Sequence, residues 1–416
     1  MKQLYIILTN TLYGLGGGQL LTLRKAHFLK KMGYYVIIVY KARYGDFRLK
    51  EDFEEVRCIY IPEFGKPYNL VSNKNKKRAL STIIEAAGTY SLNESYIESH
   101  DTQTAIWGEV LSAQLGIPHF LYLIQETNMN RLHFYPYKRF YQYKLERNEF
   151  WGCNSRGLDL SFKNELSKYS DNYINVSFDE NEVKDVPTHQ FAFPKRKSFN
   201  TIIITTVTRV DKIYLLKLIE ILEDLCKQHN EIDIQLRVIG GTVYEDAWKR
   251  IEEKANLINQ KCKNLGIILT GYMVPGKDIY QDSDMYIGTG TAVINAISQK
   301  CITIPYNSYT NKTPGLFGVE SKNFAYPEVG LCEYSVKDKI LEVIRLTEEK
   351  KRSYKEMSYQ FFRDNYSMEG TWRKFMQLSD KLPRDGRTYS FKYAKLFVVF
   401  DIIVLYATKV RDFFKK

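Results

Sequence analysis

The stretch that most constrains the fold runs from residue 201 to residue 305, because it repeats one pattern. A short apolar run is followed by a loop with glycine or a cation and then by a segment with helical spacing. The apolar runs TIIITTV, IQLRVI and DMYI lead into TRVDK, GGT and GTGT. Alternating strands and helices are typical of a parallel sheet, whose loops gather where the strands end. We therefore predict a doubly wound α/β domain whose loops bind a phosphorylated ligand.

The first half of the chain shows the same alternation. It opens with LYIILT, the loop GLGGG, a segment with helical spacing and the apolar run VIIVY. These periodicities predict two sets of elements. We expect strands near residues 4–9, 36–40, 57–61, 95–99, 119–124, 150–153, 201–206, 233–239, 266–270, 284–287 and 301–304. We expect helices near residues 19–32, 103–115, 136–148, 213–229, 243–263, 291–299, 335–348, 351–363 and 368–380.

The order and spacing of these pieces resemble a GT-B-fold glycosyltransferase of the large retaining group that includes family 4. Residues 201–305 resemble its nucleotide-sugar-binding half, residues 1–40 resemble its opening strand, glycine loop, helix and strand, and NYSMEGTWRKFMQLSDKL resembles its closing helices. The resemblance implies two Rossmann-like doubly wound domains that face a cleft. It also implies that the second domain binds the sugar nucleotide, that the first binds the acceptor, and that no metal ion or cofactor is bound.

The length also favours two domains, because a single hydrophobic core stops growing beyond about 250–300 residues and the chain has 416. Residues 179–200 lack periodicity and carry prolines and a basic run, which is typical of a linker. We therefore predict an N-terminal Rossmann-like domain on the acceptor side over 1–178, a linker over 179–200, a nucleotide-sugar domain over 201–350, closing helices over 351–382 and a basic, apolar tail over 383–416.

Cysteine spacing and the start of the chain bear on the compartment. The six cysteines are scattered, with no C-x-x-C pair and no histidine at metal-ligand spacing. We therefore expect reduced thiols and no metal site. The chain begins with a strand-like run after a single lysine, which does not fit a signal peptide. We expect a cytoplasmic protein.

The formal net charge of +12 is concentrated near the end of the chain. Residues 383–416 hold eight Lys and Arg against three Asp, or +5. These charges flank the apolar run LFVVFDIIVLYA and no stacking platform, so we do not expect nucleic-acid binding. The run is well short of the roughly 20 residues that span a bilayer. Two alternatives stay open: residues 384–416 lie on an anionic membrane surface, or they form a last helix that docks on the protein itself.

Arg209 and Lys212 are the predicted phosphate-binding cations. They lie in TRVDK, which resembles a shortened form of the family's R-L-D-x-x-K motif. This turn opens a helix, so side-chain cations and backbone N–H groups can bind a diphosphate together. We predict that both residues stabilise the leaving diphosphate. The alternative is a surface salt bridge between Arg209 and Asp211.

Glycine and threonine loops supply the other predicted donor contacts. Glycine lets a backbone approach a phosphate closely, and threonine adds a hydroxyl. The alternative for the first loop is a tight turn, and a dinucleotide site is disfavoured because no acidic residue ends the second strand. The predicted contacts come from Gly16, Gly17, Gly240, Gly241, Thr289, Gly290 and Thr291.

The donor half departs from the family at its E-x7-E segment. Alignment on Gly290 puts Ile287 and Asn295 where the two glutamates stand. We expect the Asn295 amide to accept hydrogen bonds from the ribose, without the charge assistance of a carboxylate.

The acceptor half also departs from the family pattern. The family usually has a histidine at the end of a later strand, and this chain has Gln125 at that position. Three residues are then candidates to orient or deprotonate the acceptor hydroxyl. They are Glu126, beside Gln125, and His100 and Asp101, which close an earlier strand. A purely structural role is the alternative for each.

The resemblance, together with these features, implies a glycosyltransferase that moves a sugar from a nucleoside diphosphate sugar to a hydroxyl of a glycan or lipid-linked glycan, in surface polysaccharide synthesis. It would be peripheral on the inner face of the cell membrane if the tail binds there. Retention of configuration follows from the resemblance alone. The missing glutamates leave open a non-catalytic partner subunit of GT-B shape, and the shared architecture leaves open a sugar-nucleotide 2-epimerase.

Overall fold

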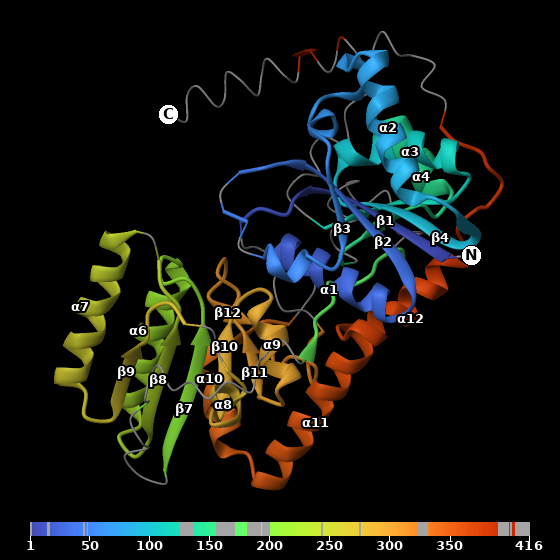
Figure 1. The fold of residues 1–416 in the computed structure, drawn as a ribbon. Helices are drawn as coiled ribbons and strands as arrows, with labels where there is room; N and C mark the ends of the chain where they lie inside the picture. The colour runs from blue at the N-terminus through green and yellow to red at the C-terminus, as the bar shows by residue number, and fades with distance from the viewer. Residues whose placement is uncertain are drawn as a thin grey trace. The chain divides into compact units, whose positions relative to one another are not determined.

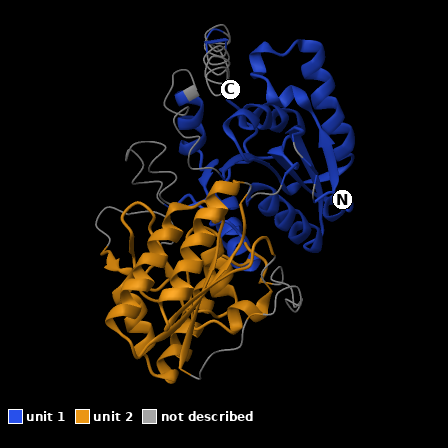
Figure 2. Cartoon of the chain, turned by 90° about the vertical axis from the view of Figure 1, so that its left-hand side faces the viewer, with its two compact units in different colours: residues 1–177, 368–416 blue, residues 178–367 orange. Residues whose placement is uncertain are grey.

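The chain divides into two compact units (Figure 2). Unit 1 comprises Met1–Ser177 and Met368–Lys416, and unit 2 comprises Phe178–Ser367. The chain therefore crosses between the units twice. The computed structural model describes residues 2–14, 17–44, 46–47, 49–124, 137–154, 171–180, 193, 200–242, 244–273, 276–322, 332–389, 399 and 402–403.

Unit 1 is built on a six-stranded parallel sheet with the strand order β3-β2-β1-β4-β5-β6. Its strands are β1 (Lys2–Thr11), β2 (Tyr34–Ala42), β3 (Arg57–Tyr60), β4 (Tyr90–Ser99), β5 (His119–Leu123) and β6 (Phe150–Gly152). Its helices are α1 (Gly17–Lys31), α2 (Asn73–Ala87), α3 (Thr102–Leu115), α4 (Tyr137–Glu146) and α12 (Met368–Ser379).

Both faces of this sheet are covered, which explains why successive residues of β1 are apolar. Tyr5 and Ile7 point to one face, where α1 and α12 pack, and Leu4 and Ile6 point to the other, where α2 and α3 pack (Figure 1). Both sets are fully buried. Full burial of an apolar side chain is worth about 1.5–3 kcal/mol, so this alternation commits β1 to the centre of a two-faced sheet.

Unit 2 is built on a five-stranded parallel sheet with the strand order β11-β10-β7-β8-β9. Its strands are β7 (Thr201–Val207), β8 (Asp233–Ile239), β9 (Leu265–Leu269), β10 (Met285–Gly288) and β11 (Thr303–Pro305), with a small antiparallel pair, β12 (Lys312–Thr313) and β13 (Tyr334–Ser335). Its helices are α6 (Ile213–Gln228), α7 (Glu245–Lys261), α8 (Lys277–Gln281), α9 (Ala292–Ser298), α10 (Val336–Arg345) and α11 (Glu348–Asn365). Buried residues of α6, α7 and α10 form one core with the sheet.

The predicted fold class of two Rossmann-like doubly wound domains is confirmed, and the predicted strands and helices are present with ends that differ by a few residues. The structure adds α2, α8 and the short pair of β12 and β13, which the sequence pattern did not predict. Of the segment assigned to closing helices, α11 belongs to unit 2 and α12 to unit 1.

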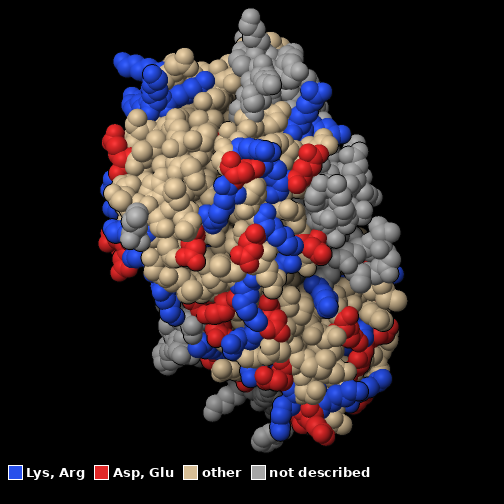
Figure 3. Space-filling model, turned by 90° about the vertical axis from the view of Figure 1, so that its right-hand side faces the viewer, with Lys and Arg blue, Asp and Glu red and all other residues tan. Residues whose placement is uncertain are grey.

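The tail and the surface charge bear on the membrane prediction. Most of 390–416 lies outside the described residues, as does most of the predicted linker. In the part of the chain that the structure describes, no helix is long and apolar enough to cross a membrane. On the face drawn in Figure 3, basic and acidic side chains are intermingled over the centre and the lower part, and a broad area at the upper left carries neither.

Candidate functional site

In unit 2 the strand order reverses between β7 and β10, and in open α/β sheets a crevice forms at the carboxyl ends of the strands at such a switch point. β8 and β9 lie on one side of β7, whereas β10 and β11 lie on the other. Ligands of open α/β sheets bind at such a switch point. The two loops there are residues 208–212 and 289–291, the two segments that the sequence predicted to bind a diphosphate.

The buried side chain of Tyr214 links these two loops by hydrogen bonds. It lies in the first turn of α6 and is 2% exposed. Its hydroxyl lies 3.2 Å from Thr206 Oγ1 and also forms hydrogen bonds with the side chains of Thr208 and Thr289. Burial raises the pKa of Tyr214, so the phenol stays protonated at neutral pH. The sequence prediction missed this residue, because nothing in its pattern separates it from an ordinary core tyrosine.

Arg209 and Lys212 lie beside this crevice and are exposed to solvent. The Arg209 side chain is 66% exposed and forms an ion pair with Asp211 at 3.3 Å, so the predicted alternative is present. Such an exposed pair is worth about 0–1 kcal/mol and leaves other guanidinium donors available. Lys212 is the N-cap residue of α6, and no side chain caps this helix start. The Lys212 ammonium forms no ion pair with any residue that the structure describes.

Gly240 and Gly241 join the loops that follow three strands. Gly240 has a φ of +134° and donates from its amide to the Gly271 carbonyl at 3.0 Å. A Cβ on Gly240 would overlap the carbonyl oxygen of Thr208. The Gly241 carbonyl accepts from the Val210 amide at 3.3 Å. These contacts explain in structural terms why both positions are glycine. The contact of both glycines with the donor stays a prediction.

The loop from Thr289 to Thr291 leads into α9 with open space around it. Gly290 has a φ of +69°, and nothing lies within 4 Å of an added Cβ. Thr291 is exposed and its hydroxyl does not cap the helix. Asn295 lies one turn further on and is half-buried, and its amide makes no hydrogen bond within the described ranges. Ile287, one of the two positions that lack a family glutamate, is fully buried in β10.

Two exposed tyrosines at the same sheet edge were not predicted as site residues. Tyr244 is 61% exposed after β8, and Tyr272 is 71% exposed after β9. The Tyr272 ring lies so close to Gly241 that any Cβ there would meet its ring carbons at 2.6 Å. An exposed aromatic ring beside a polar crevice can stack on a planar ligand. A tyrosine directly after the apolar run IILTG was the signal that could have found Tyr272.

In unit 1 the strand order reverses between β1 and β4, so the first loop and residues 100–101 share one sheet edge. Gly14 has a φ of +82°, and its amide donates to the Asp46 carbonyl at 2.7 Å, which gives this glycine a structural role. The tight turn over the whole loop stays a prediction. Gly16 lies outside the described residues. Gly17 begins α1, and nothing lies within 4 Å of an added Cβ.

His100 is 2% exposed and belongs to a buried network. Its Nε2 lies 2.8 Å from Glu98 Oε1, and its Nδ1 lies 3.2 Å from Thr9 Oγ1. Glu98 also pairs with Lys25 at 2.5 Å and accepts from the Tyr5 hydroxyl. Burial acts to raise the pKa of Glu98, but Lys25 and His100 outweigh it and lower this pKa to about 2. The carboxylate is therefore ionised and fully engaged, which favours a structural role for His100.

Asp101 begins α3 as a helix cap. Its Oδ1 accepts from the amides of Gln103 and Thr104, each at 2.9 Å, and its carboxylate pairs with Lys41 at 3.0 Å. Such a cap is worth about 0.5–2 kcal/mol. The Asp101 contacts are therefore those of a structural residue. Glu126, the third predicted acceptor-side residue, lies outside the described residues together with Gln125.

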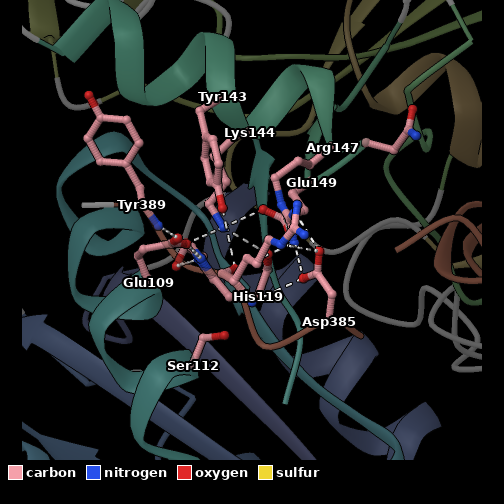
Figure 4. A network of polar contacts seen from close by, with 12 residues as sticks. Glu109, Ser112, His119, Tyr143, Lys144, Arg147, Glu149, Asp385 and Tyr389 are labelled. Atoms are coloured by element: carbon pink, nitrogen blue, oxygen red, sulfur yellow. Dashed lines mark hydrogen bonds and ion pairs between the residues drawn. The ribbon is translucent and has the colours of Figure 1, made fainter. Parts of the chain in front are cut away.

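A second buried ionic network lies between α3, β5 and α4 (Figure 4). The Lys144 ammonium pairs with Glu109 and, at 2.9 Å, with Glu149, while His119 Nδ1 lies 3.3 Å from Glu109. All four side chains are at most 5% exposed. Each ionised group faces an opposite charge, so this network is closed and offers no free group for a ligand.

Within the described ranges, no group of three or more His, Cys, Asp or Glu side chains is arranged so that it could hold a metal ion. All six cysteines are free thiols. Burial raises the pKa of Cys58, Cys226 and Cys301 to about 12, so these thiols are protonated and unreactive at neutral pH.

No protein-family model and no curated protein matches the chain. Solved structures do match it over nearly their whole length. HepE from Anabaena in complex with UDP is 12% identical, with 92% of this chain and 99% of that chain covered and a TM-score of 0.57. A glycosyltransferase from Rickettsia africae is 15% identical, with 92% and 99% covered and a TM-score of 0.59. A TarM mutant from S. aureus is 13% identical, with 90% and 99% covered and a TM-score of 0.51. These likenesses show that the chain has the GT-B fold.

Proposed function

We propose that this protein is a glycosyltransferase that moves a sugar from a nucleoside diphosphate sugar to a hydroxyl of a glycan or lipid-linked glycan, in surface polysaccharide synthesis. One observation carries the proposal: in a chain with the GT-B fold, the switch point of unit 2 presents Arg209, Lys212 and an uncapped helix start. These groups suit a diphosphate, because they offer two cations and backbone N–H donors in one place.

On the donor side, Arg209 and Lys212 neutralise the charge that develops on the leaving diphosphate. Preorganised donors of this kind lower a barrier by several kcal/mol, and they need no metal ion to do so. Thr289 to Thr291 add hydroxyl and amide donors, and the Asn295 amide accepts from the ribose. UDP is the proposed nucleotide, because HepE has been crystallised with UDP, with UDP and glucose, and with UDP-glucose. Tyr272 is the proposed stacking partner of the base.

On the acceptor side, Glu126 is the proposed residue that orients or deprotonates the acceptor hydroxyl. His100 and Asp101 shape the edge of unit 1 without moving a proton, since their polar atoms already have partners. We further propose that residues 384–416 bind an anionic membrane surface, which would bring a lipid-linked acceptor to a cytoplasmic enzyme.

The first test is UDP binding, measured by isothermal titration calorimetry. Arg209→Ala with Lys212→Ala removes two charge-assisted contacts of about 1.5 kcal/mol each, so we expect affinity for UDP to fall about 100-fold. Lys217→Ala is the matched control, because Lys217 lies on the exposed side of α6 and pairs with Glu220. If the double variant binds UDP as tightly as the wild type, the donor site does not lie at the switch point.

One observation favours a second candidate, a non-catalytic partner subunit. Neither Ile287 nor Asn295 supplies a carboxylate, and Ile287 is buried away from the loop. A partner subunit binds UDP-glucose but neither transfers nor hydrolyses its sugar. Release of UDP from UDP-glucose, abolished by Arg209→Ala with Lys212→Ala, rejects this candidate. UDP binding without turnover against glycan acceptors supports it.

A further inference from the structure

The two strands at the switch point of unit 2 stop pairing with each other before they end. The structure describes every residue of β7 and β10, and their paired register ends at Thr205 and Tyr286. β7 nevertheless pairs with β8 up to Val207, and β10 pairs with β11 up to Gly288. The last two residues of β7 and β10 are therefore linked by contacts other than strand pairing.

Two buried tyrosine side chains make these contacts. The Tyr286 hydroxyl donates to the Val207 carbonyl at 3.3 Å. A Cβ on Gly288 would meet this hydroxyl at 2.6 Å, so the Tyr286 side chain can lie there because residue 288 is glycine. The second tyrosine is Tyr214, in the first turn of α6, whose hydroxyl forms a hydrogen bond of 3.2 Å with Thr206 Oγ1 in β7.

Tyr214 differs from Tyr286 because its hydroxyl also bonds with the two loops that follow these strands. Its partners there are the side chains of Thr208, after β7, and Thr289, after β10. A phenol hydroxyl donates one hydrogen bond and accepts others, so it can bond with several threonines at once. The Thr208 hydroxyl donates to the Arg209 carbonyl at 3.3 Å. One buried hydroxyl thus links the backbone of Arg209 to the loop that begins at Thr289.

We propose that Tyr214 is a positioning residue that makes this site select a nucleoside diphosphate over a nucleoside monophosphate. The inference rests on the proposed function, which assigns the diphosphate to these two loops. A diphosphate has two phosphate groups and can contact both loops, so its affinity depends on their separation. A single phosphate can be held by one loop alone. Tyr214 is 2% exposed and acts through the loops without touching the ligand, because groups that are held in place before binding cost less to order.

Tyr306 offers a matched control from the same core. It is 1% exposed, and its ring centre lies 5.3 Å from that of Tyr214. Its hydroxyl donates to Asn311 Oδ1 at 3.0 Å, and Asn311 belongs to neither loop. Tyr306→Phe therefore removes a buried hydroxyl next to Tyr214 and leaves the hydrogen bonds to Thr208 and Thr289 intact.

The test measures the affinities of the full chain for UDP and UMP by isothermal titration calorimetry, with UMP followed by displacement of UDP. Tyr214→Phe keeps the ring and removes only the hydroxyl. We expect this variant to bind UDP about tenfold more weakly, because one charge-assisted contact loses its position. We expect its affinity for UMP to change less than about twofold. Unchanged affinity for UDP, or equal losses for UDP and UMP, overturns the proposal.

Melting temperatures and the control variant separate positioning from a loss of packing. Tyr214→Phe and Tyr306→Phe should lower the melting temperature by similar amounts, since each removes one hydroxyl from the same core. Tyr306→Phe should bind UDP as tightly as the wild type. If Tyr306→Phe weakens UDP binding as much as Tyr214→Phe does, the effect comes from packing and the proposal is wrong.

A double-mutant cycle with Thr289→Val tests whether Tyr214 acts through that loop. The two substitutions together should weaken UDP binding by less than the product of their single effects. Effects that multiply would show that the two side chains act independently. The proposed function fails separately, if UDP does not bind or if Arg209→Ala with Lys212→Ala leaves its affinity unchanged. If that double variant loses UDP binding and Tyr214→Phe does not, only the positioning role is wrong.

Discussion

Gly240 ends β8 in a conformation that residues with a Cβ rarely adopt, with a φ of +134°. A Cβ there would also overlap the carbonyl oxygen of Thr208, so the loop that carries Arg209 rests directly on this glycine. Gly290 shares the positive φ, at +69°, but an added Cβ would meet nothing within 4 Å. Substitutions at these two positions can therefore separate the cost of backbone strain from the cost of steric overlap.

Gly240→Ala is expected to lower the free energy of unfolding by about 3 kcal/mol or more, since strain and overlap act together. Gly290→Ala is expected to lower it by about 1–2 kcal/mol, because strain acts alone. Urea denaturation of both variants checks the difference. Gly240→Ala should also weaken UDP binding, because the shifted Thr208 carries Arg209 with it. If the two variants are equally stable, the loop after β7 moves away from the added Cβ without a cost in free energy, and the argument from steric overlap is wrong.

For single residues, the sequence predicts where a site lies better than it predicts which residues hold that site in place. The ends of apolar runs locate Arg209, Lys212 and Gly240, because parallel strands all end at one edge. The Lys25 and Glu98 pair could not be predicted, because the two residues lie 73 positions apart on α1 and β4 and only the fold brings them together. The same limit applies to Tyr214, whose partners lie at the end of β7 and in the loops that follow β7 and β10.

Between elements, the polar network around Lys144 also fixes the start of the C-terminal segment. Arg147, which follows α4, holds the Asp385 carboxylate with two hydrogen bonds of 3.1 and 2.8 Å. The Tyr389 amide donates to Glu109 at 2.6 Å, and the Tyr389 ring packs 5.4 Å from that of Tyr143 (Figure 4). The start of the basic, apolar tail, up to Tyr389, is thus attached to unit 1.

This attachment defines where the tail can be removed without disturbing unit 1. A chain that ends after Tyr389 keeps the contacts of Asp385 and Tyr389, so we expect its melting temperature to be unchanged. We expect it to lose co-sedimentation with vesicles that contain anionic lipid, because the basic and apolar residues that follow are gone. The full chain should bind these vesicles and not neutral ones. Equal sedimentation of the two chains would exclude the tail as the membrane anchor.

Two α-helices were not predicted from the sequence, for different reasons. α2 opens with NKNKKR, which reads as a solvated charged run, yet Ala79, Leu80 and Ile83 bury one face and Ser72 caps the helix start. Its apolar stripe is present but short. α8 has five residues, too few for a helical period to appear in the sequence.

Of the two units, unit 1 carries the buried carboxylates whose shifted pKa values make the free energy of unfolding depend on pH. Burial acts to raise the pKa of Glu98 and Glu109, but Lys25 and Lys144 together with neighbouring histidines outweigh it and lower both to about 2. For His119, burial and the Lys144 ammonium lower the pKa to about 4, against an opposing effect of Glu109. In the described part of unit 2, carboxylates with lowered pKa, such as Glu223 and Asp224, lie near the surface, where ion pairs contribute little.

We therefore expect acid to unfold unit 1 before unit 2. Between pH 6.5 and 4, unfolded chains bind a proton at residue 119 that the folded state excludes, so this histidine lowers the free energy of unfolding by about 1.4 kcal/mol per pH unit as pH decreases. Glu149 opposes part of this loss, because burial raises its pKa and the folded state then binds a proton more readily than the unfolded chain. Between pH 4.5 and 2, Glu98 and Glu109 add to this loss, because their folded pKa lies below the unfolded value. Trp248→Phe leaves Trp107, Trp151 and Trp372 as reporters, all in unit 1. Urea titrations of this variant at pH 7, 6 and 5, followed by tryptophan fluorescence, measure the slope. His119→Gln in the same background should flatten it by one proton between pH 6.5 and 4, and an unchanged slope would show that the acid sensitivity comes from another group.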